Sequence, residues 1–377
     1  MYRYVRKPRL IAAGLAAVVN AAAVLLAAGS ASAKHDDGYT VHNLVSDQPG
    51  VADHQDPNLV DAWGIAANAT SPWWVANNGT DTSTLYNGDG VAQFQPTPLV
   101  VSVPGGPTGT VANSNGSAFV ISDGNGHSGS ARFLFATEDG TIRGWSPAVP
   151  PPPLSTQTFV GPNDADQSGA GAIFKGLAIT GDHLYAADFH NAKVDVFDSS
   201  FHLVPSGFLD PKLPSGYAPF GIQAIGGNIF VSYAKQDADA EDEVAGQGLG
   251  FVDEYSAGGT LIGRVAQHGL LNAPWGMAMA PDDFGFASGD LLVGNFGNGT
   301  IAVYQPNKHA DSVHGGFTPR GLLRGEDGLP ITIDGLWGIG FGNGSGSGDT
   351  DDLYFAAGPD DEHHGLFGEI AVASEDH

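Results

Sequence analysis

The 377-residue sequence contains no cysteine. The chain can therefore form no disulfide, offers no thiolate nucleophile and binds no metal through sulfur. A chain of this length can bury a large core without covalent cross-links.

Positive charge is also scarce, because 15 Lys and Arg residues face 41 Asp and Glu residues, a net charge of −26. This balance disfavours nucleic acid and anionic membranes as partners. It permits cations, basic proteins and neutral ligands, and it also serves solubility.

Several catalytic signatures are missing as well. No serine stands in a Gly-x-Ser-x-Gly frame, and the chain has no Walker loop, dinucleotide fingerprint or haem-attachment motif. The glycine-rich run at 342–348 lacks the lysine of a phosphate-binding loop.

The N-terminus has the three parts of an export signal. Basic residues between positions 3 and 9 precede an apolar run at 10–28 and a small-residue site, Ala31-Ser-Ala33. We predict a signal peptide at 1–33 and one mature domain at 34–377, secreted to the extracellular space or the periplasm. An uncleaved membrane anchor is the alternative. Cleavage removes four basic and no acidic residues, which takes the net charge from −26 to −30.

A short apolar strand motif recurs six times. The clearest copy spans Phe174–Asp198, and the other copies begin near Trp63, Phe119, Phe220, Trp275 and Trp337. Each copy is interpreted as four short strands, and Asp139-Gly140 and Asn298-Gly299 mark tight turns between the second and third strands.

Six four-stranded repeats predict an all-β fold, a six-bladed β-propeller with antiparallel blades. The last repeat has only three clear strands, so we expect Tyr39–Val45 to complete it and close the ring. We expect a monomer.

The segment Leu184–Asp198 resembles an NHL-type repeat. In that family the Asp and Asn of this turn are mainly structural, which the resemblance implies for Asp188 and Asn191.

A longer resemblance, to a family of exported bacterial propellers of unknown function, covers nearly all of the mature chain. It rests on Asp56–Ile65, Tyr233–Asp239, Asp242–Asp253, Ala273–Met277 and Gly335–Ile339. It implies the fold and export, but no activity. Some members carry a C-terminal sorting tail, whereas this chain ends at His377 without a hydrophobic anchor.

Four polar loops break the repeat, at 53–58, 163–166, 235–243 and 359–364. Strand order places all four on one face, around one mouth of the channel. The ligand-binding candidates are Lys235, Gln236, Asp237, Asp239, Asp53, His54 and Asp56. One interpretation is that these loops bind a cation, which would be Ca²⁺ through their oxygen atoms or a transition metal through His54, His363 and His364. The other is that they form a solvated acidic surface.

Polar residues also close the second strand of several repeats. The metal-ligand candidates among them are Asn77, Glu138, Asp188 and Asn295. The structural interpretation is that they cap strand ends and hold turns. The tryptophans that follow the repeat are expected to pack between blades.

Two hypotheses of function follow. The first is a secreted binding or scaffold propeller that recognises a ligand, glycan or protein through its channel mouth. The second is a divalent-metal-dependent, lactonase-like hydrolase with its metal in the central channel, by analogy with six-bladed gluconolactonase-type propellers.

Overall fold

The structure is a computed structural model that describes residues 38–94, 96–151, 155–307 and 316–373. The predicted signal peptide at 1–33 lies outside these residues. Among the described residues, no helix has the length and apolar character needed to cross a membrane.

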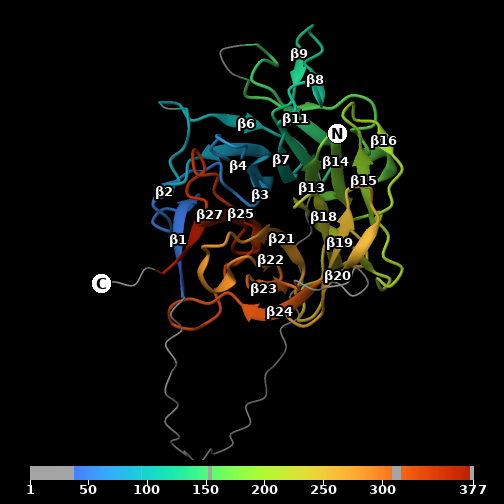
Figure 1. The fold of residues 1–377 in the computed structure, drawn as a ribbon. Coiled ribbons are helices and arrows are strands. Elements are labelled where there is room, and N and C mark those ends of the chain that lie inside the picture. The colour runs from blue at the N-terminus through green and yellow to red at the C-terminus, as the bar shows by residue number, and fades with distance from the viewer. Residues whose placement is uncertain (1–37, 95, 152–154, 308–315, 374–377) are drawn as a thin grey trace, which may run out of the picture. The chain divides into compact units, whose positions relative to one another are not determined.

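Six β-sheets form the blades of a propeller (Figure 1), which confirms the predicted fold. Blade 1 consists of β3 (Ala62–Ala66), β4 (Trp73–Asn77), β5 (Thr82–Tyr86) and β6 (Val100–Ser102). Blade 2 consists of β7 (Pro107–Ala112), β10 (Phe133–Thr137), β11 (Ile142–Trp145) and β12 (Phe159–Val160). Blade 3 consists of β13 (Phe174–Thr180), β14 (His183–Asp188), β15 (Lys193–Phe197) and β16 (Leu203–Val204). Blade 4 consists of β17 (Tyr217–Ile225), β18 (Asn228–Lys235), β19 (Phe251–Ser256) and β20 (Leu261–Gln267). Blade 5 consists of β21 (Pro274–Met279), β22 (Leu291–Asn295), β23 (Ile301–Pro306) and β24 (Phe317–Leu322).

Blade 6 joins the two ends of the chain. It contains β25 (Leu336–Phe341), β26 (Leu353–Ala357) and β27 (Leu366–Val372), followed by β1 (Tyr39–Ser46) and β2 (His54–Gln55). Strand β1 pairs antiparallel with β27, as expected from the sequence, with Tyr39 opposite Val372. The short β2 adds parallel to β1, so this sheet has five strands rather than four.

The second repeat begins earlier than predicted. Its innermost strand is β7, whereas Phe119 lies next to β8 (Val120–Ser122), which forms a separate hairpin with β9 (Ser128–Ser130). The prediction was wrong because β7 carries Thr108 where four of the other five repeats carry an aromatic residue, while Phe119 and Ile121 are buried in or beside an inserted hairpin that resembles a repeat start.

A ring of glycines lets the innermost strands approach one another. A Cβ atom on Gly64 would lie 2.5 Å from the Thr108 carbonyl oxygen of the next blade, and one on Gly338 would lie 2.6 Å from that of Trp63. The equivalent residues are Gly109, Gly176, Gly221 and Gly276. Each innermost strand thus packs against the next, and the contact of β25 with β3 completes the circle.

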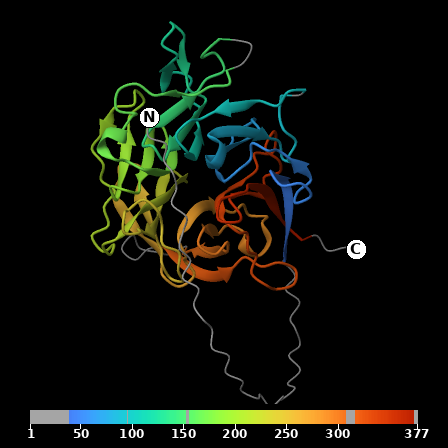
Figure 2. The same cartoon turned by 180° about the vertical axis from the view of Figure 1, so that it is seen from behind.

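Short 3₁₀ turns make up the helical structure of the described residues: η1 (Asn78–Thr80), η2 (Ser168–Ala170) and η3 (Gly285–Ala287). Figure 2 shows the ring from behind, with the β8–β9 hairpin extending beyond the blades at the top. Large apolar side chains fill the spaces between neighbouring blades, for example Phe174, Phe197 and Leu134 between blades 2 and 3.

Candidate functional site

Aromatic side chains close the propeller axis. Trp63 stacks on Trp337 with ring centroids 3.6 Å apart, and Phe296 stacks on the same indole at 4.0 Å. Trp275 meets Trp337 edge-on at 5.6 Å, and Phe220 lies at the same distance. The tryptophans pack between neighbouring blades, as expected, because Trp337 of blade 6 contacts Trp275 of blade 5 and Trp63 of blade 1; Trp63 and Trp275 also meet, with ring centroids 6.2 Å apart.

A small cavity lies beside the aromatic cluster. Its volume is about 30 Å³, and it lies between the innermost strands, bordered by Thr110, Leu177 and Ile339 among others. That volume is the share of one water molecule in the liquid. This cavity is therefore too small for an organic ligand.

One charged side chain lies inside the aromatic cluster. Lys175 occupies the position of Trp63 in its repeat and is 1% exposed. Its Nζ lies 2.7 Å from Glu138 Oε1, 3.2 Å from Asp242 Oδ1 and 5.3 Å from the centre of the Trp63 ring. Its carbonyl oxygen accepts a hydrogen bond from Trp275 Nε1 at 2.8 Å. A buried ammonium is tolerated only with such partners.

Further polar groups continue this contact around the mouth. Asn78 Nδ2 donates to Glu138 Oε2 at 3.0 Å, and the Asn78 backbone N–H donates to the Asp61 carbonyl at 2.9 Å. Asp61 Oδ1 accepts from Trp63 Nε1 at 2.8 Å. We call Asp61, Asn78, Glu138, Lys175 and Asp242 the mouth network. It links blades 1 to 4.

Three of the four metal-ligand candidates hold turns of their own blades. Asn77 Nδ2 donates to Thr82 and Thr84 hydroxyls at 3.1 and 3.0 Å. Asp188 accepts from the Asn191 backbone and side chain at 3.2 and 2.8 Å.

Asn295 shows the same pattern, because its Oδ1 accepts from the Asn272 backbone at 2.9 Å and its Nδ2 donates to Thr300 Oγ1 at 3.1 Å. The fourth candidate, Glu138, is paired with Lys175.

The fit to a divalent cation is therefore poor. Asn77 Oδ1 is buried without a hydrogen-bond partner among the described residues, but one amide oxygen is far from the six to eight that Ca²⁺ takes. In the described part of the chain, no group of three or more His, Asp or Glu side chains is arranged to hold a metal ion.

The insertion between β18 and β19, residues 236–250, is tied down at several points. Gln236 Nε2 donates to the Phe189 carbonyl of blade 3 at 2.6 Å, and Asp237 Oδ1 accepts from the Glu241 backbone at 3.0 Å. Lys235 and Asp239 are exposed. The insertion reaches the axis through Asp242.

The other ligand-binding candidates lie further out. His54 is in β2, the outermost strand of blade 6, and Asp53 pairs with His42 at 2.9 Å. Asp56 Oδ2 accepts from the Tyr86 hydroxyl at 2.9 Å. The structure therefore does not bring these residues into contact with the insertion.

The remaining two loops contact different partners. His364 Nδ1 lies 2.8 Å from Asp47 Oδ2, and His363 is exposed. Asn163 Nδ2 donates to the Ser200 carbonyl of blade 3 at 2.7 Å.

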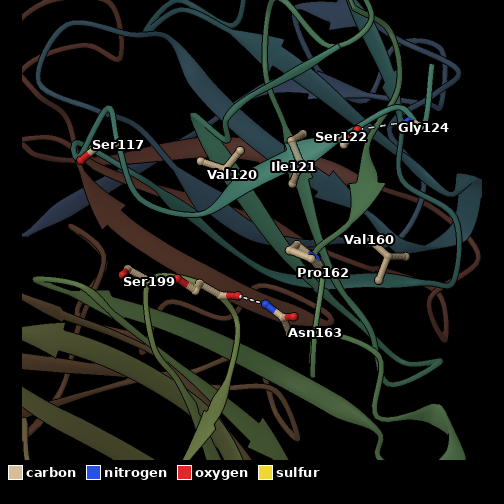
Figure 3. Close-up of a pocket in the computed structure, with 10 residues that line it drawn as sticks. Ser117, Val120, Ile121, Ser122, Gly124, Val160, Pro162, Asn163 and Ser199 are labelled. Carbon is tan, nitrogen blue, oxygen red and sulfur yellow. Dashed lines mark hydrogen bonds between the residues drawn. The ribbon is translucent and has the colours of Figure 1, made fainter. Parts of the chain in front are cut away.

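A larger cavity lies at the periphery (Figure 3). It has a volume of about 560 Å³ and is enclosed by the inserted hairpin, the segment after β12 and the turn between β15 and β16. We call it the hairpin groove; its lining includes Val120, Ser122, Val160, Asn163 and Ser200.

Sequence reasoning missed both Lys175 and the hairpin groove. Aligning the six repeats on their glycines would have exposed Lys175 as a charge at an aromatic position. The groove gave no comparable signal, because it depends on how the hairpin packs against blade 3.

The fold and these contacts define a six-bladed propeller with a filled axis, a polar mouth and a groove at its rim. The chain belongs to the same family as "Uncharacterized protein R648" of Acanthamoeba polyphaga mimivirus, 33% identical over 340 residues that cover 88% of this chain and 80% of the viral protein. "Uncharacterized protein L690" of the same virus is 32% identical over 88% of this chain and 85% of its own length. No family model matches the chain.

Solved structures share the fold at low identity. The soluble aldose sugar dehydrogenase of Escherichia coli superimposes with a TM-score of 0.51 at 12% identity, over 89% of this chain and 100% of that one. A protein of unknown function from Bacteroides thetaiotaomicron superimposes with a TM-score of 0.53 at 12% identity, over 89% of this chain and 76% of that one. At this identity the likeness shows the fold alone.

Proposed function

We propose that the protein is an exported binding or scaffold propeller that recognises its ligand through the loop face at the channel mouth. The observation that carries this proposal is the filled axis. Aromatic rings and the Lys175 pair occupy the centre, so a ligand has access to the loops rather than to the interior. Lys235, at the end of β18, and Asp239, in the insertion, are exposed, and the same insertion contacts the centre through Asp242.

The metal-dependent hydrolase receives less support. A lactone and a metal need more than the roughly 30 Å³ of the cavity between the innermost strands. The Lys175 ammonium also lies against Glu138, where a divalent cation would otherwise bind. The Lys175 ammonium and a divalent cation bound to the same carboxylate would repel each other strongly in this buried site.

The ligand class follows from charge. The net charge of −26 favours a neutral glycan or a basic protein over a polyanion. A glycan array and a panel of purified basic proteins are suitable probes, with binding measured at two salt concentrations.

The test compares two double variants against any probe that binds. Lys235→Glu with Asp239→Lys inverts the charge of the last residue of β18 and of one exposed residue of the insertion, without changing the net charge. Asp282→Lys with Asp283→Lys, in the loop that joins the first and second strands of blade 5, is the control on the opposite face. We expect at least a tenfold loss of affinity for the first variant and little change for the second.

Two results would refute the proposal. One is equal binding by the wild type and the insertion variant. The other is lactone hydrolysis that EDTA abolishes and added Ca²⁺ restores, which would favour the hydrolase.

A further inference from the structure

The β8–β9 hairpin is an insertion that no blade needs. It lies between β7 and β10 in the sequence, pairs as a two-stranded sheet of its own, and stands at the rim in Figure 1. Isolated two-stranded hairpins are marginally stable in water, so this one requires support from the propeller.

Blade 3 supplies that support. The Phe119 N–H donates to the Ser199 carbonyl at 2.8 Å, and the Phe119 ring packs edge-on against Phe201 with centroids 5.4 Å apart. Asn115 Nδ2 donates to Asp182 Oδ1 at 2.8 Å. The hairpin is therefore fixed to the neighbouring blade, and the hairpin groove between them is formed before any ligand arrives.

The outer edge of β8 faces this groove. Ala131 N–H donates to the Phe119 carbonyl and Asp123 N–H to the His127 carbonyl, so the odd-numbered residues of β8 face β9. Backbone groups alternate along a strand, so those of Val120 and Ser122 point away from β9. Both residues line the groove and are exposed, and β9 is the only described strand that pairs with β8.

The groove has the dimensions of a short strand. In Figure 3, Val120, Ile121 and Ser122 lie on one side of the cavity, with Pro162, Asn163 and Ser199 on the other. A strand residue occupies roughly 160 Å³, from a rise of 3.3 Å, a strand spacing of 4.8 Å and a sheet spacing of 10 Å. The volume of about 560 Å³ thus holds three to four residues.

Charge selects among extended segments. Asp198 and Asp164 precede and follow the groove residues Ser199 and Asn163 in the sequence, and the Asp164 side chain is 45% exposed. Together with the net charge of −26, they favour a segment flanked by lysine or arginine and disfavour an acidic one.

We propose that the hairpin groove binds a short extended segment of a basic partner protein, which adds to the outer edge of β8 as a further strand. Main-chain hydrogen bonds to Val120 and Ser122 provide the affinity, and the apolar surface of Val120 and Val160 accepts alternate side chains. This site is separate from the channel mouth and does not depend on the function proposed there.

The test uses the whole protein and the fluorescent peptide acetyl-Lys-Val-Thr-Val-Lys-amide, with Glu in place of both Lys residues as the acidic control. Ser122→Pro removes an N–H that points into the groove and leaves the bonds to β9 intact, since proline is tolerated on edge strands. The matched control is Ser128→Pro. Ser128 is an exposed serine on β9, directly opposite Ser122, and the N–H of Ser128 points away from both β8 and the groove.

We expect the basic peptide to bind at least tenfold more tightly than the acidic one, Ser122→Pro to lower its affinity at least tenfold, and Ser128→Pro to leave it unchanged. Hydrogen exchange in the wild type should slow at the Val120 and Ser122 amides when the peptide is added, which tests the site without any substitution.

Three results would overturn the proposal: no peptide binding, equal binding of both peptides, or exchange protection elsewhere in the propeller. If sedimentation instead shows a dimer that Ser122→Pro dissociates, a second copy of the chain covers this edge and the peptide proposal fails.

Discussion

Replacing Lys175 with methionine tests whether the positive charge of Lys175 stabilises the fold by pairing with the carboxylates of the mouth network. The substitution keeps most of the side-chain volume but removes the ammonium from Glu138, whose side chain is 11% exposed, and from Asp242, which is 39% exposed. Removing one partner of a buried pair costs about 3–5 kcal/mol because the other charge stays buried. The Asp242 part contributes little, since that carboxylate is partly solvated.

We therefore expect Lys175→Met to lower the free energy of unfolding by about 3 kcal/mol. A chain of this size has an unfolding entropy of roughly 0.7 kcal/mol/K, so the melting temperature should fall by about 4 °C. Calorimetry or circular dichroism at neutral pH measures this change. Lys235→Met, which removes an exposed lysine, should shift the free energy by no more than about 0.5 kcal/mol.

The double variant Lys175→Met, Glu138→Gln tests whether the loss of stability comes from the unpaired charge of Glu138. It removes both buried charges, and Asn78 can still bond to the side chain at position 138. We expect the double variant to regain about 2 kcal/mol over Lys175→Met alone, because replacing both members of a buried pair is often nearly neutral. Equal stability of the single and double variants would show that the pair does not hold the centre together.

Other perturbations test the remaining features. Gly221→Ala should destabilise the ring by about 2–3 kcal/mol, because the new Cβ would collide with the Trp275 carbonyl, whereas Gly116→Ala has open space and should be neutral. Burial raises the pKa of Asp253 to about 6, so the native state binds its proton more readily than the unfolded chain. Stability should therefore rise as the pH falls from about 6 towards 4, and Asp253→Asn should remove that part of the dependence in melts at several pH values. If the loops or the strand-end residues bind Ca²⁺, the melting temperature should be higher in excess Ca²⁺ than in EDTA; the hydrogen bonds at Asn77 and Asp188 lead us to expect no difference. Mass spectrometry of the exported protein should find Lys34 at its N-terminus, and retention of residues 1–33 would contradict the signal peptide.

The sequence predicts the blades because their determinants are local. A glycine and short apolar strands recur in each copy, and in four of the six copies an aromatic residue precedes the glycine. Gly140 and Gly299 have φ of 79° and 71°, as the turn prediction requires. Closure by the N-terminal strand follows from counting strands. Blade 2 was misplaced where this local signal fails, at Thr108.

The centre of the molecule was harder to predict. Lys175 is read locally as a polar residue in a strand, and its burial depends on Glu138 from blade 2 and Asp242 from blade 4. These residues are 37 and 67 positions away in the sequence. No periodicity in one repeat reveals which carboxylates converge from its neighbours. The hairpin groove likewise depends on a contact between two blades.

The aromatic residue at the axis is missing from two adjacent blades. Blades 1, 4, 5 and 6 place Trp63, Phe220, Trp275 and Trp337 at the axis, whereas blades 2 and 3 place Thr108 and Lys175 there. Thr108 is buried and donates to the Phe174 carbonyl at 2.7 Å, so even this small residue bridges to blade 3. Blade 2 also carries the inserted hairpin and blade 3 the surface that holds it. Ring closure requires neither the inserted hairpin nor a charged residue at the axis, so we propose that these two blades carry ligand contacts. Blades 2 and 3, with the insertion of blade 4, are where ligand contacts should first be sought.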